Sequence, residues 1–319
     1  MILLHPTVFA AKNYFAAYPT AEIANSQVQM RLYLPDSVNG YYRASRFDWS
    51  GIIAEVNYKG HSYFGEWKDT HDPFMHDDVT GPVEGSIKAG FGHDEAPVGG
   101  EFIRLGVGIL HKQAENYIFD KTYEIKNHGD WKINKGNDWI EFRHKVRSNN
   151  GYAYIYSKRI ELLKNEAGFV IKHKLMNTGS KTIETDQFNH NFFTIDNGIT
   201  GTGFTLKFPF APEIANDKKS KGFFEIKNNE LVFSRDVTED FVFARFNKLP
   251  SSTENNFELI NKISGAGVSV KVDKPMYSLV FWARTNVICP ENSVFISVAP
   301  GMHETWDSKY LLFEKNILP

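Results

Sequence analysis

The segment GFVIKHKLMNTGSKTIETDQFNHNFFTID, residues 168–196, contains two β-strand patterns joined by a turn. In the first, Ile171 and Leu175 alternate with Lys172 and Lys174, and this period of two is typical of a half-buried strand. The cluster NTGS supplies the Asn and Gly that a tight turn favours. The second pattern ends in DQFNHNFF, which places one imidazole, that of His190, among amides and aromatic rings. We therefore expect a strand, a turn and a second strand that ends at a polar site.

The same strand pattern recurs along the chain, while helical periodicity is nearly absent. Turn clusters such as NNG (149–151) and ISGAG (263–267) separate the runs, and no Pro/Gly/Ser-rich linker divides them. The sequence therefore predicts an all-β protein, a large antiparallel sandwich that occupies residues 1–319 as a single domain. The runs are IIAEVNY (52–58), FIRLGVGIL (102–110), WIEFRHKV (139–146), AYIYSKRIELL (153–163), FVIKHKLMN (169–177), GVSVKV (267–272), YSLVFWA (277–283) and VFISVA (294–299).

Composition excludes several classes of function. Lys and Arg total 36 against 38 Asp and Glu, and the charges are interspersed, so we expect neither a nucleic acid nor an anionic membrane surface as partner. The single cysteine, Cys289, rules out an intrachain disulfide. With 26 Phe, 14 Tyr and 6 Trp, the chain can build a large core and still place aromatic rings in a binding site.

Targeting signals are weak. The N-terminal stretch is mildly apolar but lacks a basic region, and His5, Pro6 and Lys12 interrupt it. No segment approaches the roughly 18 apolar residues of a membrane span. We therefore expect a cytoplasmic protein, with the periplasm as the alternative. The sequence does not indicate an oligomeric state.

Two segments together resemble the aldose 1-epimerase (galactose mutarotase-like) superfamily. The first is the strand, NTGSKTI turn and NHNFF segment around His190. The second is FWARTNVICPENSVFISVAPGMHETWDSKYLLFE (281–314), with a Glu beside a Pro near a strand end and a PG turn before the last strand. The resemblance implies a β-supersandwich fold and a carbohydrate as the partner. It is carried mainly by the last 150 residues or so.

The resemblance also implies catalytic roles. His190 corresponds to the acid and Glu291 to the base, and His93, in the loop GFGHDEAPVGG, stands where the family has another histidine. Here Asp94 follows His93 where the family usually has Gly, and Glu291 follows Pro290 where the commoner order is the reverse.

Mutarotation explains why these residue types are needed. It opens a cyclic hemiacetal and closes it on the opposite face, so one group takes the proton of the anomeric hydroxyl while another protonates the ring oxygen. A carboxylate and an imidazole can exchange protons near neutral pH. No cofactor is required. We expect His190 and Glu291 to face one cavity, separated by the sugar ring and too far apart for direct contact, with His93 supporting the charge on the ring oxygen.

Candidate sugar-binding residues come from several segments. In RFDWSG, a strand would send Arg46 and Asp48 to one face and the aromatic pair to the other, which suits a bound sugar and equally a surface ion pair over a buried Trp. An aspartate that binds a sugar hydroxyl is sought among the acidic residues of SRDVTEDFVFA. Basic side chains that could converge on a phosphate are Arg46, Arg104 and Lys112, and we expect one of three tryptophans to line the site. The remaining candidates are Asp236, Asp240, Trp49, Trp67 and Trp282.

Other motifs predict no further chemistry. The loop HDPFMHDD (71–78) holds two histidines and three aspartates, but consecutive ligands in a polar loop do not make a tight metal site, and we expect none. GVG at 106–108 lacks the remaining glycine of a dinucleotide fingerprint. We expect Cys289, next to Pro290, to be a core thiol.

Three classes of function fit the sequence. The first is an aldose 1-epimerase-like isomerase that interconverts sugar anomers. The second is a carbohydrate-binding protein of the same fold without catalysis, and the third is a glycan lyase or hydrolase built on a β-sandwich. The His and the Glu in the expected segments favour the isomerase.

Overall fold

A computed structural model describes residues 17–216, 220, 222–238, 241–250 and 254–316. Strands dominate this part of the chain, and all their pairings are antiparallel. A short 3₁₀ helix, η2 (Ile195–Asn197), follows the segment that contains His190. The predicted all-β antiparallel class is confirmed. The prediction that residues 1–319 form one domain stays a prediction.

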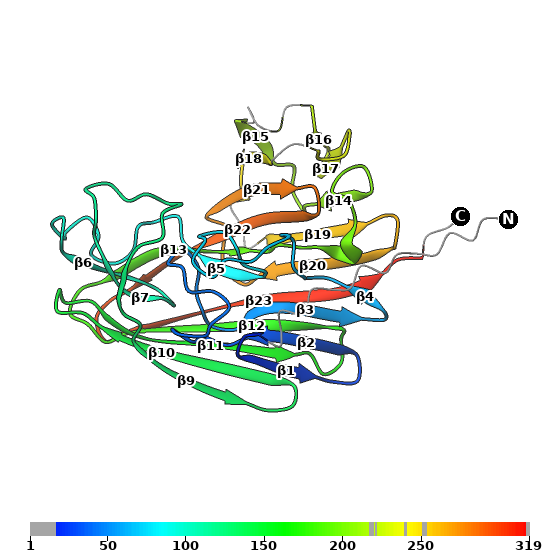
Figure 1. Ribbon diagram of the computed structural model, residues 1–319. Coiled ribbons are helices and arrows are strands. Elements are labelled where there is room, and N and C mark those ends of the chain that lie inside the picture. The colour runs from blue at the N-terminus through cyan, green and yellow to red at the C-terminus, as the bar shows by residue number, and fades with distance from the viewer. Residues whose placement is uncertain (1–16, 217–219, 221, 239–240, 251–253, 317–319) are drawn as a thin grey trace.

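Two large sheets form the body of the protein (Figure 1). The ten-stranded sheet has the spatial order β16 (Phe224–Lys227), β17 (Glu230–Phe233), β14 (Phe204–Lys207), β19 (Asn255–Asn261), β20 (Ala266–Val272), β23 (His303–Glu314), β12 (Gly168–Asn177), β11 (Ala153–Leu162), β10 (Trp139–Arg147) and β9 (Asp130–Lys135). The six-stranded sheet has the order β15 (Glu213–Asn216), β18 (Val242–Asn247), β21 (Ser278–Arg284), β22 (Val287–Val298), β13 (Ile183–His190) and β5 (Val83–Gly85).

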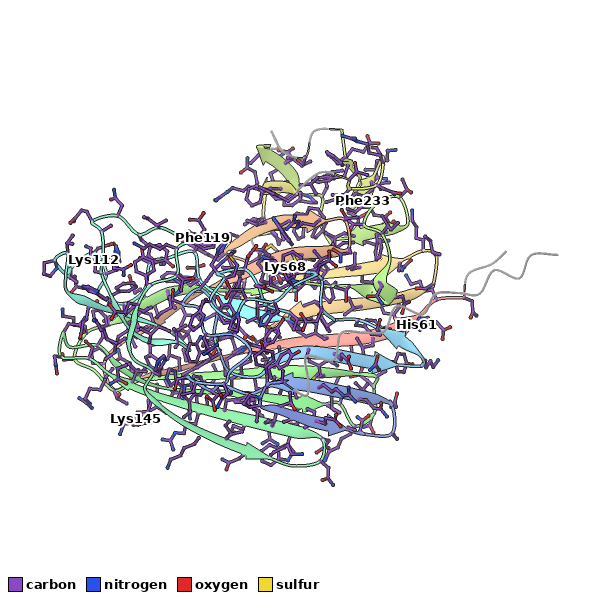
Figure 2. All side chains as sticks on the ribbon, in the orientation of Figure 1. His61, Lys68, Lys112, Phe119, Lys145 and Phe233 are labelled. Carbon is purple, nitrogen blue, oxygen red and sulfur yellow. The ribbon has the colours of Figure 1, made fainter. Side chains whose placement is uncertain are left out.

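Two smaller sheets complete the fold. One consists of β1 (Thr20–Ala24), β2 (Val28–Tyr33), β3 (Ile52–Tyr58) and β4 (His61–Ser62). The other consists of β6 (Glu101–Arg104), β7 (Gly108–His111) and β8 (Ile125–Asn127). Two side chains labelled in Figure 2 mark the width of the ten-stranded sheet: Phe233 on β17 lies near one edge, and Lys145 on β10 lies near the other.

The core forms because one face of each large sheet is apolar. On β10, Ile140, Phe142, His144 and Val146 are buried, while the residues that alternate with them are partly or fully exposed. Such side chains pack against residues of the six-stranded and four-stranded sheets, including Phe281 and Val56. The alternation that predicts half-buried strands therefore reflects two layers of sheet that bury their facing sides.

One run that the sequence predicts as a single strand forms two strands in the structure. The run at 102–110 is split between β6 and β7 by a turn at 105–107. Gly106 has a φ of 72°, and a Cβ there would lie 2.2 Å from Oδ1 of Asp48, so the turn requires glycine. The segment therefore forms a hairpin whose turn depends on Gly106, and the continuous apolar pattern does not indicate this turn.

Within the described residues, no helix is both long and apolar enough to cross a membrane.

Candidate active site

Strand register brings the two predicted catalytic residues together. β13 and β22 pair with Phe188 opposite Ser293, and the same register continued by two residues sets His190 opposite Glu291. Directly opposed residues of an antiparallel pair point to the same face of the sheet. Nε2 of His190 lies 3.3 Å from Oε1 of Glu291, and both side chains are largely buried, 5% and 11% exposed.

This contact corrects two expectations. The prediction that the sugar ring separates His190 from Glu291 is wrong for this structure, because the two side chains touch. Glu291 also does not end a strand, since β22 continues through it from Val287 to Val298. A gap between the two side chains is not needed for mutarotation. The anomeric hydroxyl oxygen and the ring oxygen are bonded to the same carbon, so adjacent groups can reach both.

The amides around His190 hold its strand in place from the other face. Because side chains alternate along a strand, Gln187, Asn189 and Asn191 point away from the face that carries His190. They form a continuous chain of hydrogen bonds. Trp306 Nε1 donates to Gln187 Oε1 (2.7 Å), Gln187 Nε2 to Asn189 Oδ1 (2.6 Å), Asn189 Nδ2 to Tyr310 Oη (2.9 Å), Tyr310 Oη to Asn191 Oδ1 (2.8 Å), and Asn191 Nδ2 to the Pro290 carbonyl (2.6 Å).

This chain of hydrogen bonds supports the strands of both His190 and Glu291. Tyr310 and Trp306 belong to β23 of the ten-stranded sheet, whereas Pro290 immediately precedes Glu291. A buried polar network whose members are all bonded rigidifies its surroundings. The asparagines of the DQFNHN segment therefore position His190 on one strand and Glu291 on the next.

A cavity of about 640 Å³ opens over the pair. Its floor is the six-stranded sheet, and its opposite wall comes from loops after β4 and β7, where Figure 2 labels Phe119. Its volume is typical of small-molecule sites. The aromatic lining residues are Tyr117, Phe119, Phe188, Phe192, Phe241, Phe243 and Trp282, and the ionisable ones are Arg46, His76, Asp77, Tyr117, Asp120, His190, Arg245, Arg284 and Glu291.

Burial decides the protonation of the pair. It raises the pKa of Glu291 to about 8, against the opposing effect of the Arg46 and Arg245 charges. Burial, followed by the Arg46 charge, lowers the pKa of His190 well below its ordinary value. At neutral pH the pair therefore holds one exchangeable proton, as a carboxylic acid beside a neutral imidazole. An isolated glutamate, with its ordinary pKa of 4.5, would be ionised at this pH.

The His190 ring is held by aromatic neighbours. It stacks on Phe192, with ring centroids 3.8 Å apart, and meets Phe47 and Trp282 edge to face at 5.6 Å and 5.5 Å. Its Nδ1 is buried and has no hydrogen-bond partner among the described residues. Nε2, beside Glu291, is therefore the nitrogen through which the ring can exchange protons.

Two of the predicted sugar-binding residues line this cavity. The Arg46 guanidinium lies over the rings of Phe47 and Phe119, 4.6 Å and 4.3 Å from their centroids. Trp282, on β21, meets the expectation that a tryptophan lines the site. Trp67 packs behind it, stacked on Phe192 at 5.5 Å.

Three other candidates lie outside the cavity. Residues 46–49 form no strand beyond a bridge at Phe47, and Asp48 and Trp49 are both buried. Asp48 accepts hydrogen bonds from the Ser50 backbone and hydroxyl, at 2.8 Å and 2.6 Å, and burial raises its pKa to about 6. Arg104 donates to the Ser86 and Arg46 carbonyls. These groups support the fold, and residues 46–49 do not form the strand considered for RFDWSG.

The remaining basic and acidic candidates are also elsewhere. Lys112 donates to the carbonyls of His93 and Ala96. His93 lies in a separate hollow, with Nδ1 2.9 Å from Asp94 Oδ1. Its ring meets Phe102 and the cavity residue Tyr117 edge to face, at 5.0 Å and 5.6 Å between centroids. Asp236 accepts from the Thr202 backbone at 3.1 Å and is exposed. Asp240 lies outside the described residues.

Some residues of the 71–78 loop form hydrogen bonds that support the fold, and others line the cavity. His71 Nδ1 lies 3.0 Å from Asp78 Oδ1, and its Nε2 lies 2.8 Å from the Tyr41 carbonyl. His76 and Asp77 line the cavity instead. In the part of the chain that the structure describes, no three His, Cys, Asp or Glu side chains are grouped as metal ligands. The absence of a tight metal site stays a prediction.

Several lining residues could not be recognised in the sequence. Arg245 on β18 and Arg284 at the end of β21 share the cavity face with Trp282, because the register sets Arg245 opposite Val280 and Phe243 opposite Trp282. The alternation FVFAR around residues 241–245 shows two faces. Which face meets the site depends on sheet order, which the sequence does not show.

Known proteins share this fold. No family model matches the sequence, and no curated protein matches it significantly. A galactose mutarotase-like protein from Lactobacillus casei is 12% identical, with 92% of this chain and 100% of that chain covered and a TM-score of 0.56. For an aldose epimerase homologue from C. elegans the values are 13%, 94%, 100% and 0.56. For a galactose mutarotase-like protein from Clostridium acetobutylicum they are 12%, 94%, 100% and 0.56. The chain therefore has the galactose mutarotase-like β-supersandwich fold, as its sequence predicts.

Proposed function

We propose that the protein is an aldose 1-epimerase-like isomerase, which interconverts the anomers of a sugar by opening and closing its ring. The observation that carries the proposal is the contact between His190 Nε2 and Glu291 Oε1, 3.3 Å long, at the floor of an aromatic-lined cavity. The fold shared with mutarotase-like proteins agrees with it.

Ring opening needs one member of the pair to carry a proton that it can donate and the other member to be free to accept a second proton. When a sugar is bound, one member of the pair takes the proton of the anomeric hydroxyl and the other gives a proton to the ring oxygen. The bond from the anomeric carbon to the ring oxygen breaks, and a carbonyl forms. Rotation about the neighbouring carbon–carbon bond presents the other face, and the reverse transfers close the ring. The pair ends with the single proton it began with.

The protonation of the empty site suits either direction of transfer. A carboxylic acid beside a neutral imidazole holds the same number of protons as a carboxylate beside an imidazolium. Either group can therefore serve as acid while the other serves as base. The assignment of His190 as acid and Glu291 as base, which the resemblance implies, is one of these two arrangements.

Arg46 takes the supporting role that the resemblance assigns to His93. Its guanidinium is held between two rings inside the cavity, whereas the His93 ring lies behind Tyr117. A fixed cationic donor next to the reacting oxygens stabilises negative charge as it develops. Trp282, which is partly exposed, supplies flat apolar surface for the C–H face of a sugar.

Anomer exchange measured by NMR across neutral hexoses, hexuronates and hexose phosphates tests this function. We expect the wild-type protein to accelerate exchange of at least one sugar, and His190→Asn to lose about 10²–10⁴-fold of that acceleration. His303→Asn is the matched control, because His303 is exposed on β23. Binding without acceleration of any sugar would instead support the carbohydrate-binding protein that lacks catalysis.

A further inference from the structure

The sheet that carries the catalytic pair also carries a cationic side chain in the same row. Glu291 is opposite Val280 on β21, and Val280 is opposite Arg245 on β18. With His190 opposite Glu291, the row reads His190, Glu291, Val280, Arg245, and all four line the cavity. Residues in such a row point to one face.

The row sets a distance. Neighbouring strands lie about 4.8 Å apart, so the backbones of Glu291 and Arg245 are separated by about 10 Å across β21. The long arginine side chain can cover part of that gap. A sugar ring with its anomeric carbon at the pair and its long axis along this row would bring its far end to Arg245.

Arg245 and Arg46 are not held in ion pairs within the part of the protein that the structure describes, although both charges act on the Glu291 carboxyl. Neither forms an ion pair or a hydrogen bond with a described side chain, although each lies near aromatic rings. In addition, Nε of Arg46 is buried without a hydrogen-bond partner. Arg104 differs, because backbone carbonyls accept hydrogen bonds from its guanidinium. Two guanidinium groups thus face the cavity with donors available.

The acidic groups of the cavity do not neutralise the positive charges of Arg46 and Arg245. Burial raises the pKa of Glu291 to about 8, so its carboxyl is mostly neutral at pH 7. Asp77 is paired with Lys68 at 2.7 Å. Asp77 and Asp120 lie on the loop wall, whereas Arg245 belongs to the sheet.

We propose that the cavity accepts a sugar with an anionic substituent, a phosphate or a carboxylate, at the end of the ring away from the anomeric carbon, and that Arg245 binds this group. The inference rests on the proposed function, which places the anomeric carbon at His190 and Glu291. Guanidinium groups bind both anions through paired N–H donors. Arg46 lies nearer the pair, and its positive charge favours the same anionic sugars.

Isothermal titration calorimetry tests the inference without requiring turnover. A hexose 6-phosphate, the matching hexuronate and the neutral hexose are titrated into the full chain at pH 7 and low salt. We expect an anionic sugar to bind more tightly than the neutral one, with affinity that falls as salt is added. Arg245→Gln should weaken binding of that anionic sugar roughly 10- to 100-fold and leave the neutral hexose unchanged. Arg147→Gln, an exposed residue of β10, is the control and should bind as wild type does.

The outcomes separate the inference from the function beneath it. Equal binding of neutral and anionic sugars, or an Arg245→Gln protein that binds the anionic sugar as wild type does, overturns the inference, even if anomers exchange. Selective binding of the anionic sugar that depends on Arg245, but without anomer exchange, supports the anion site and contradicts the isomerase. Comparison of the phosphate and the uronate shows which anion the site prefers.

Discussion

The Tyr310 hydroxyl donates a 2.8 Å hydrogen bond to Oδ1 of Asn191, the residue that follows His190. The same hydroxyl accepts a bond from Asn189, so one side chain of β23 holds both neighbours of the histidine. The position of the imidazole is thus set by contacts on the face of β13 opposite to His190.

We predict that Tyr310→Phe lowers the free energy of unfolding by about 1–3 kcal/mol, because two buried amides lose their partner. It should also slow anomer exchange, since Asn191 links β13 to the carbonyl of Pro290. Urea unfolding and NMR exchange measure the two effects. Tyr277→Phe is the control, because Tyr277 is 53% exposed. A Tyr310→Phe protein with unchanged stability would show that the amides find other partners.

The protonation of the pair predicts the pH dependence of catalysis. In the proposed mechanism the pair holds one proton, and it loses that proton as pH rises through the pKa of Glu291, which burial raises to about 8. We therefore expect kcat/KM to be level near neutral pH and to fall tenfold per pH unit above about 8. At acid pH it should fall again, when His190, whose pKa burial lowers, gains a second proton.

This profile is measured by NMR exchange between pH 5 and 10, with the spontaneous rate subtracted at each pH. A kcat/KM that rises through pH 8 would mean that a fully ionised Glu291 is the active form, contrary to the shared-proton pair.

The raised pKa of Glu291 also affects stability. A carboxyl whose folded-state pKa, about 8, exceeds the ordinary 4.5 stabilises the fold fully below pH 4.5, and this contribution is lost as pH rises to 8. Glu291→Gln keeps the shape of the side chain and does not titrate. The variant should therefore gain stability relative to wild type by about 2–3 kcal/mol between pH 6 and 9. Urea unfolding of both proteins at the two pH values measures the change, and a constant difference would contradict the buried, protonated carboxyl.

Much of the fold could be predicted because local pattern and tertiary structure agree. The run 52–58 is β3 and the run 139–146 is β10 within a residue, since one face of each strand meets the core. His190 and Glu291 could be named from the resemblance. Their contact could not, because it depends on the register of strands about 100 residues apart.

The candidate residues that the structure places outside the cavity have a common physical feature. Asp48, Trp49 and Arg104 are polar or aromatic residues in loops and strand ends, where sequence cannot distinguish a ligand contact from a buried structural bond. Arg245 was missed for the opposite reason, since an arginine in an alternating strand usually faces solvent. Only the order β18, β21, β22, β13 places it beside the site.

Anomer exchange by Glu291→Gln is the most direct test of the proposed acid–base pair. The variant and the wild type are compared by NMR on the sugar that the wild type turns over best, and calorimetry measures its binding to both. Glu101→Gln is the matched control, because Glu101 is exposed at the start of β6. We predict that Glu291→Gln exchanges anomers about 10²–10⁴-fold more slowly than wild type while its affinity changes only a few-fold. Exchange at the wild-type rate would contradict the role of Glu291 and with it the mechanism.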